Sequence, residues 1–211
     1  MHGVFLSYAG WQGPRDRSSE GLMITSGRRS HKRVSVIGIG NVLLGDDGFG
    51  PLAVEMFRSA YECDSNVEIL DLGTPGLDIA PYLYDTDLVV LADTILVDER
   101  PGTLCIYSEA DLFSRRSQLR VTAHDPGVQE SLVQLRLAGH APSELIIVGV
   151  VPDSCGLGES ISPWVLSASF VAIDNIARLL AERTIACRRR EVPAQPHLWW
   201  LSGDQRELVS S

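Results

Sequence analysis

From Val34 onward, short runs of hydrophobic residues alternate with amphipathic stretches along the chain. The hydrophobic runs are rich in β-branched residues and nearly uninterrupted, as in strands that are buried on both faces. This alternation is typical of an α/β sheet that carries helices on its faces. The pattern predicts five strands: Val34–Ile39, Val67–Leu72, Leu88–Asp93, Thr103–Tyr107 and Leu145–Val151.

Helical spacing predicts four helices between and after these strands. A first helix begins near Pro51, a shorter one covers Leu77–Tyr84, and a third contains Val128 and the hydrophobic positions that follow it. The longest helix is expected to begin after Ser162, which is a suitable N-cap residue, with Pro163 in its first turn. Its inward-facing residues are predicted to be Val165, Ser169, Ile173, Ile176 and Leu180.

The topology can be predicted in part from the lengths of the connections. The link from Leu88–Asp93 across Pro101 and Gly102 is too short for a crossover helix. We therefore expect Thr103–Tyr107 to pair antiparallel beside Leu88–Asp93. The predicted fold class is α/β: a single three-layer α/β/α domain with a mixed, mostly parallel sheet of about five strands.

The 211 residues are enough for one compact domain. Residues 1–32 are rich in Gly, Ser and Arg without periodicity, which predicts a flexible N-terminal arm. Residues 33–185 form the predicted α/β domain, and residues 186–211 a C-terminal tail. The tail contains two prolines that exclude a helix there, followed by Trp199 and Trp200. It either frays or docks on the domain or on a partner.

The net charge of the chain is −9, and the negative charge is concentrated in residues 34–185. Nucleic-acid-binding proteins need a basic face, so this balance argues against a nucleic-acid partner. An acidic domain is typical of a protein that binds a cationic partner or a metal ion. The surface of an ordinary soluble protein can have the same composition, so the charge alone does not distinguish the two interpretations.

The cysteines are widely scattered and form no C-x-x-C pair: Cys63, Cys105, Cys155 and Cys187. This spacing indicates neither a thiolate metal site nor a disulfide framework, and it favours a cytoplasmic location. We also expect no membrane association, because the nearest hydrophobic run, Val34–Leu44, is too short and is interrupted by Gly38 and Gly40.

Candidate functional residues follow the predicted strands, because ligands of open α/β sheets bind at the carboxyl ends of the strands. Asp47, Asp93 and His124 come from three separate loops that the predicted topology can bring to one edge. Two carboxylates and one imidazole are a plausible ligand set for zinc or nickel. For Asp46, which also precedes a helix, capping of that helix and a role in the site both remain open.

The sequence argues against two other kinds of site, a dinucleotide-binding site and a serine or cysteine nucleophile. Gly38-x-Gly40 follows a strand, as in a dinucleotide fold, but Leu43 stands where the third glycine belongs and the loop continues into acidic residues. Serine hydrolysis is disfavoured because the chain has no G-x-S-x-G motif, and Cys155 has no base beside it in the sequence.

The segment Gly38–Gly50 reads GIGNVLLGDDGFG. It resembles the opening motif of the hydrogenase maturation proteases, endopeptidases that trim the C-terminus of the [NiFe]-hydrogenase large subunit. The resemblance covers about residues 34–183 and continues through Asp71–Gly76, Leu91–Asp93, Pro101–Thr103, the His124 loop and Val148–Pro152.

This resemblance implies a function and a set of site residues. It implies an endopeptidase that removes a short C-terminal peptide from the nickel-loaded large-subunit precursor, with the nickel carried by that precursor. Asp47, Asp93 and His124 would contact the metal, whereas the catalytic residue is not identified. The residues that would recognise the substrate are Asn41, Asp71, Gly73 and Thr74.

One departure from the family pattern concerns the second of these loops. Leu72 replaces the first glycine of the usual Asp-Gly-Gly-Thr, so the backbone freedom of this loop is expected to be reduced. The alternative function is a non-catalytic module, either a nucleotide sensor or a nickel-dependent checkpoint that holds the precursor without cutting it.

Overall fold

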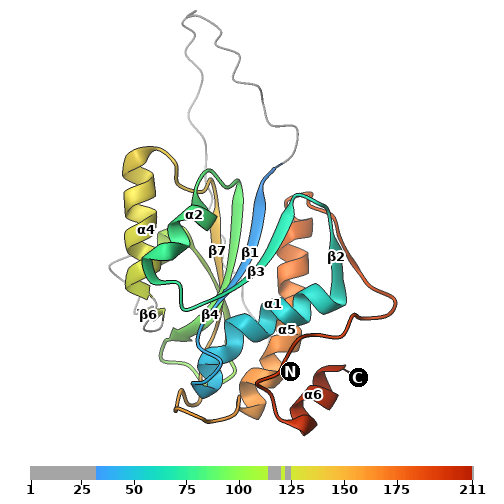
Figure 1. Cartoon of the computed structure of the whole chain (residues 1–211). Helices are drawn as coiled ribbons and strands as arrows, with labels where there is room; N and C mark the ends of the chain where they lie inside the picture. Colours follow the sequence, from blue (N-terminus) through green and yellow to red (C-terminus); the bar gives the residue numbers. More distant parts are fainter. Residues whose placement is uncertain (1–31, 114–119, 122–124, 211) are drawn as a thin grey trace, which may run out of the picture. The chain divides into compact units, whose positions relative to one another are not determined.

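A computed structural model of the chain describes residues 32–113, 120–121 and 125–210. The predicted N-terminal arm, apart from residue 32, and the candidate ligand His124 lie outside the described residues. The described part of the chain contains the sheet and helices that the hydrophobic pattern predicts (Figure 1).

The main sheet has five strands in the order β3-β1-β4-β7-β5, with β6 (Arg120–Val121) added at the end of β4. Four of the five strands run parallel, and β5 runs antiparallel to β7. The mixed, mostly parallel sheet is therefore confirmed. The strands are β1 (Val34–Ile39), β3 (Val67–Gly73), β4 (Leu88–Leu96), β5 (Leu104–Ser108) and β7 (Leu145–Val150).

The predicted neighbour of β5 is wrong. Strand β7 lies between β4 and β5, parallel to β4, and Cys105 of β5 stands opposite Gly149 of β7. The turn before β5 lies at the end of β7, where the N–H of Gly102 donates to the carbonyl of Val151 across 2.8 Å. A short connection excludes a crossover helix, but it is long enough to pass the end of one strand, since neighbouring strands are only about 4.8 Å apart.

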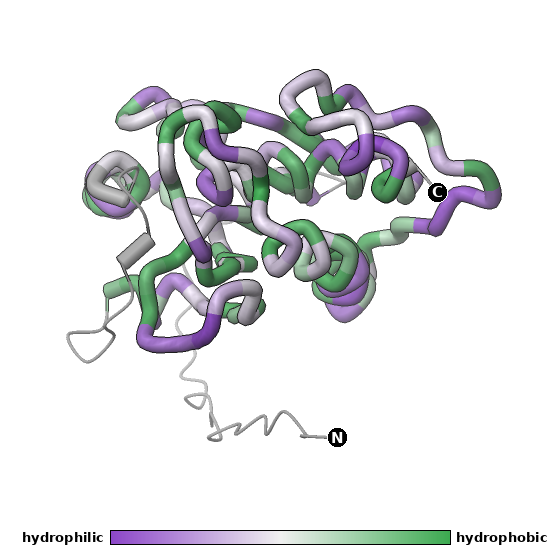
Figure 2. Tube along the Cα trace, turned by 90° about the horizontal axis from the view of Figure 1, so that it is seen from below, coloured by the Kyte–Doolittle hydropathy of each residue, from purple (hydrophilic) through white to green (hydrophobic). Residues whose placement is uncertain are grey.

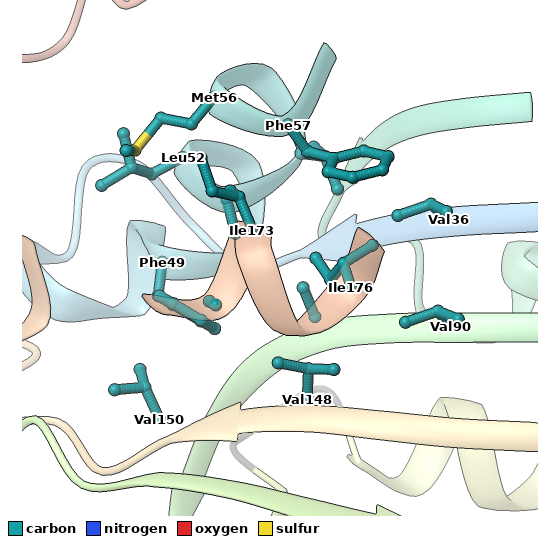
Figure 3. Packing of buried hydrophobic residues seen from close by; sticks show 14 of the residues in the cluster. Val36, Phe49, Leu52, Met56, Phe57, Val90, Val148, Val150, Ile173 and Ile176 are labelled. Atoms are coloured by element: carbon teal, nitrogen blue, oxygen red, sulfur yellow. The ribbon is translucent and has the colours of Figure 1, made fainter. Parts of the chain in front are cut away.

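Two long helices cover one face of the sheet. They are α1 (Phe49–Ala60), which follows the 3-10 turn η1 (Gly45–Gly48), and α5 (Pro163–Ala181). As Figure 3 shows, Leu52 and Ile173 pack between the helices above sheet residues such as Val90. The Ser162 side chain accepts a hydrogen bond from the N–H of Val165, so the predicted N-cap is confirmed.

Over the residues that the structure describes, one 3-10 turn and two α-helices cover the opposite face. They are the 3-10 turn η2 (Gly76–Ile79), α2 (Ala80–Leu83) and α4 (Asp125–Ala138), and together they bury a second core. Helix α3 (Glu109–Leu112) follows β5. Because both faces of the sheet are covered, the central strands are hydrophobic along their length. The helices in Figure 2 carry both hydrophobic and hydrophilic residues, as expected for helices with one buried face. The three-layer α/β/α arrangement is confirmed.

Helix α5 is long and hydrophobic enough, by length and composition alone, to cross a membrane. Half of its most hydrophobic window is buried inside the domain. Its inward face consists of the residues predicted from the sequence, from Val165 through Ile173 to Leu180, and all of them are buried. The core therefore accounts for one face of α5, whereas Trp164, Phe170 and Val171 are exposed.

Cys63 and Cys187 form a disulfide across 124 positions, which corrects the expectation that no disulfide is present. The bond joins β2 (Tyr61–Cys63) to β8 (Cys187–Arg189), which pair antiparallel. Such a pair has no local spacing signal, since only folding brings the two cysteines together. The expected cytoplasmic location loses this part of its support and stays a prediction.

The C-terminal segment docks on the domain. Leu198 and Leu201 are only 3% and 4% exposed and belong to the core beneath α1 and α5. The segment ends in α6 (Gly203–Ser210), a helix that begins beyond the two prolines. Of the two alternatives for the tail, docking on the domain is the one that the structure shows.

Candidate functional site

Glycines let helix α1 approach the sheet closely at the carboxyl end of β1. A Cβ atom at Gly38 would lie 2.3 Å from the carbonyl oxygen of Gly50, and one at Gly40 would lie 1.9 Å from that of Asp47. Gly40 also has a φ of +140°, which favours glycine. The glycines of the motif therefore serve helix packing and bring Asp47 over the strand ends, instead of surrounding a phosphate.

Asp47 is 4% exposed and is held by two loops. One carboxylate oxygen accepts a hydrogen bond from the N–H of Asn41 across 2.8 Å. The other accepts from the hydroxyl of Thr94 across 3.3 Å. These contacts fix the carboxylate between the end of β1 and the end of β4.

Asp93 lies in β4, the central strand, and is fully buried. It stands opposite Gly149 of β7, and one of its carboxylate oxygens accepts from the N–H of Thr94 across 2.7 Å. Thr94 thus contacts both predicted metal-binding carboxylates, through its backbone to Asp93 and through its side chain to Asp47. Two of the three predicted ligands therefore meet at one place.

The third predicted ligand, His124, lies outside the described residues. Among residues 32–113, 120–121 and 125–210, no group of three or more His, Cys, Asp or Glu residues is arranged to hold a metal ion. Asp47 and Asp93 by themselves offer oxygen donors, which suit a divalent cation that already has other ligands.

Asp46 does not cap α1, and its carboxylate binds the backbone of a distant loop. It is 1% exposed, and helix α1 and turn η1 have no side-chain cap. Its carboxylate accepts from three backbone N–H groups of the loop after β7: Asp153 at 2.7 Å, Ser154 at 3.3 Å and Ser162 at 2.6 Å. Asp46 therefore holds the loop of residues 152–162 against the carboxyl end of β1.

The predicted recognition residues lie on two adjoining loops. The N–H of Gly40 donates to the carbonyl of Gly73 across 2.8 Å and joins these loops. Asp71 is exposed and accepts from the N–H of Gly73 across 2.9 Å, while Thr74 is exposed beside it. Asn41, besides binding Asp47, accepts from the N–H of Leu43 across 3.0 Å.

Leu72 does not strain its loop. The register between β1 and β3 shifts so that Gly38 pairs with Asp71 and Ile39 with Gly73, which leaves Leu72 as the extra residue of a bulge. The side chain of Leu72 packs against the second core, and among the described residues the left-handed non-glycine positions are Asp85 and Thr184. The replacement of glycine therefore leaves the backbone in an ordinary conformation.

Two residues of this site were missed as functional candidates or left without a role. Thr94 follows Asp93 directly, but nothing in the sequence marks it as a partner of Asp47. The thiol of Cys155 hydrogen-bonds the backbone of Asp47, and partial burial, together with the nearby Asp47 and Asp46 carboxylates, raises its pKa to about 11. Cys155 is thus a neutral thiol next to Asp47, and only the fold reveals this proximity.

Comparison with known proteins agrees with this geometry. The family model described as hydrogenase maturation protease matches residues 51–179. The hydrogenase expression/formation protein HupD of Bradyrhizobium diazoefficiens is 34% identical over 162 residues, which cover 76% of this chain and 84% of the relative. Hydrogenase 2 maturation protease of Escherichia coli is 31% identical over 75% of this chain and 97% of its own length.

Solved structures of hydrogenase maturation proteases also have this fold. The hydrogenase maturating endopeptidase HybD from E. coli superimposes with a TM-score of 0.69 at 29% identity, covering 75% of this chain and 98% of that one. The [NiFe] hydrogenase maturation protease HybD from Thermococcus kodakarensis superimposes with a TM-score of 0.58 at 25% identity over 70% and 98% of the two chains. With this fold and these carboxylates, the chain belongs to the hydrogenase maturation protease family and is a peptidase that acts in hydrogenase maturation.

Proposed function

We propose that this protein is an endopeptidase that removes a short C-terminal peptide from the nickel-loaded large-subunit precursor of a [NiFe] hydrogenase. The observation that carries the proposal is the meeting of Asp47 and Asp93 at the carboxyl edge, with Thr94 bonded to both. The relatives, which include a hydrogenase 2 maturation protease and a [NiFe] hydrogenase maturation protease, support the same substrate class.

In this proposal, nickel arrives as part of the substrate. Asp47, Asp93 and His124 contact the precursor-borne ion, and a precursor without nickel lacks this contact and is rejected. Hydrogen bonds from Thr94 and from the N–H of Asn41 hold the carboxylates in place before the substrate arrives. The neighbouring loop, with Asp71, Gly73 and Thr74, receives the peptide around the cleavage position.

The test is an incubation of the protein with the purified large-subunit precursor, with and without nickel, followed by mass spectrometry. We expect loss of a C-terminal peptide in the nickel-loaded sample alone. The variants Asp47→Asn, Asp93→Asn and His124→Ala should each abolish processing while the circular dichroism spectrum stays unchanged. Asp78→Asn, which alters an exposed carboxylate of η2, is the matched control and should process normally.

Two outcomes would overturn the proposal. Normal processing by all three site variants would show that the site is elsewhere. An unchanged precursor mass with verified nickel would exclude cleavage, and a stable nickel-dependent complex in that sample would favour the checkpoint alternative.

A further inference from the structure

Residues 187–210 form a strap that runs along the domain from one covalent anchor to the site. The strap begins at the Cys63–Cys187 disulfide, where β8 pairs with β2. In Figure 1 it descends in red past α1 and ends in α6, beside the lower end of α5. The family model matches residues 51–179, so the strap lies outside the matched residues.

The middle of the strap is bonded to the end of helix α1. The N–H of Arg190 donates to the carbonyl of Ala60 across 2.8 Å, and the N–H of Ala194 donates to that of Ser59 across 3.0 Å. The buried side chains of Leu198 and Leu201 follow. The strap is thus fixed along its length, and the position of α6 is set by the domain.

Helix α6 begins with a reciprocal cap formed by Ser202 and Gln205. The N–H of Gln205 donates to the Ser202 hydroxyl, and the N–H of Ser202 donates to the side-chain oxygen of Gln205, both across 3.3 Å. The side-chain nitrogen of Gln205 takes no part in this cap. It donates to the carbonyl of Ile161 across 2.7 Å.

Ile161 belongs to the loop of residues 152–162, here called the site loop. Asp46 holds this loop through the N–H groups of Asp153, Ser154 and Ser162. The N–H of Gly158 in the same loop donates to the carbonyl of Leu43, close to Asp47 in the chain. The contact from Gln205 therefore reaches the loop that borders the predicted metal-binding carboxylates.

We propose that Gln205 is a positioning residue: through the carbonyl of Ile161 it holds the site loop in the arrangement that the peptidase reaction uses. The effect on processing rests on the proposed function, whereas the effect on the loop does not. Asp46 holds the loop from the side of β1, and Gln205 holds it from the side of the strap. Loss of either contact frees one side of the loop.

The two roles of Gln205 can be separated by substitution. Gln205→Glu keeps the side-chain oxygen that accepts from Ser202, and a carboxylate suits a helix N-terminus, but it removes the donor to Ile161. Ser202→Ala weakens the cap and keeps that donor. Gln205→Glu therefore tests the contact with the site loop, and Ser202→Ala is the matched control.

The measurements are amide hydrogen exchange and processing kinetics. In Gln205→Glu we expect faster exchange at the amides of Asp153, Ser154 and Ser162 and unchanged exchange in β4. We expect kcat/KM for the nickel-loaded precursor to fall about three- to tenfold, in proportion to one lost hydrogen bond. Ser202→Ala should change the exchange of α6 amides and leave the site loop as in the wild type.

Site-loop exchange that is identical in Gln205→Glu and the wild type would overturn the proposal. So would faster exchange without any loss of kcat/KM, since the contact would then hold the loop without serving the reaction. Failure of the wild-type protein to process the nickel-loaded precursor would count against the proposed function instead, and the exchange experiment would still decide whether Gln205 holds the loop.

Discussion

The hydroxyl of Thr94 lies 3.3 Å from a carboxylate oxygen of Asp47, a residue 47 positions earlier in the chain. The backbone N–H of Thr94 donates to Asp93 across 2.7 Å. The side-chain hydroxyl and the backbone N–H of one fully buried residue therefore contact two carboxylates, Asp47 from turn η1 and Asp93 from strand β4. Groups that orient metal-binding side chains in this way commonly affect metal affinity or activity by about 10- to 100-fold.

Replacement of Thr94 tests this relationship. Thr94→Val keeps the shape of the side chain and removes the hydroxyl, so we expect about a tenfold or greater loss of processing rate on the nickel-loaded precursor. Thr94→Ser keeps the hydroxyl and should recover most of the activity. Equal rates for the valine and serine variants would show that the hydrogen bond to Asp47 has no part in the reaction.

Gly40 should tolerate no side chain. Alanine there combines an unfavourable φ with a Cβ atom 1.9 Å from the carbonyl oxygen of Asp47. We expect Gly40→Ala to lower the free energy of unfolding by more than about 3 kcal/mol, or to prevent folding. Gly139 also has a positive φ but open space around it, so Gly139→Ala should cost only about 1–2 kcal/mol. Urea unfolding of both variants gives the comparison, and similar losses would contradict the packing argument.

The Cys63–Cys187 disulfide should stabilise the fold, because it closes a long loop and fixes the start of the strap. Dithiothreitol should lower the Tm of the wild type, and the double variant Cys63→Ser/Cys187→Ser should lose about 2–4 kcal/mol of stability. The double variant should not respond to the reductant. Cys105→Ser, which alters a free cysteine, serves as the control and should respond as the wild type does. A wild-type Tm that is insensitive to dithiothreitol would argue against the disulfide.

Glu144 gives a pH-dependent contribution to stability. A hydrogen bond from Arg183 is the main cause that lowers the pKa of Glu144 from its ordinary 4.5. A lowered carboxylate pKa adds stability above pH 4.5 that is lost as the pH falls through the lower folded-state value. Because this pair is partly exposed, Glu144→Gln should cost no more than about 1 kcal/mol at neutral pH. Urea unfolding across this pH range checks the effect, and a loss that persists at the acidic end would contradict the titration.

Much of the fold and part of the site could be predicted from the sequence. Burial produces a periodic pattern within each element, so the strands from Val34 and Leu145 and the N-cap at Ser162 were predicted almost to the residue. Asp47 and Asp93 were predicted to lie together because Asp93 ends a predicted strand, Asp47 lies in the loop after another, and the carboxyl ends of parallel strands share one edge of the sheet. In the structure both are bonded to Thr94. These predictions use only the periodicity within each segment and the rule that ligands of open α/β sheets bind at the carboxyl ends of the strands.

The remaining features depend on contacts between distant parts of the chain. The place of β5 beside β7, the binding of Asp46 to a loop more than 100 residues later, and the Cys63–Cys187 bond are choices among partners. The spacing of hydrophobic residues along a segment indicates which face of that segment is buried. It does not indicate which other segment covers that face. The sequence by itself therefore determined the five strands of the main sheet, the main helices, the family motif and two carboxylates of the candidate site. Only the tertiary structure decided what those elements pack against, how Thr94 joins the two carboxylates, and that Gln205 reaches the loop beside them.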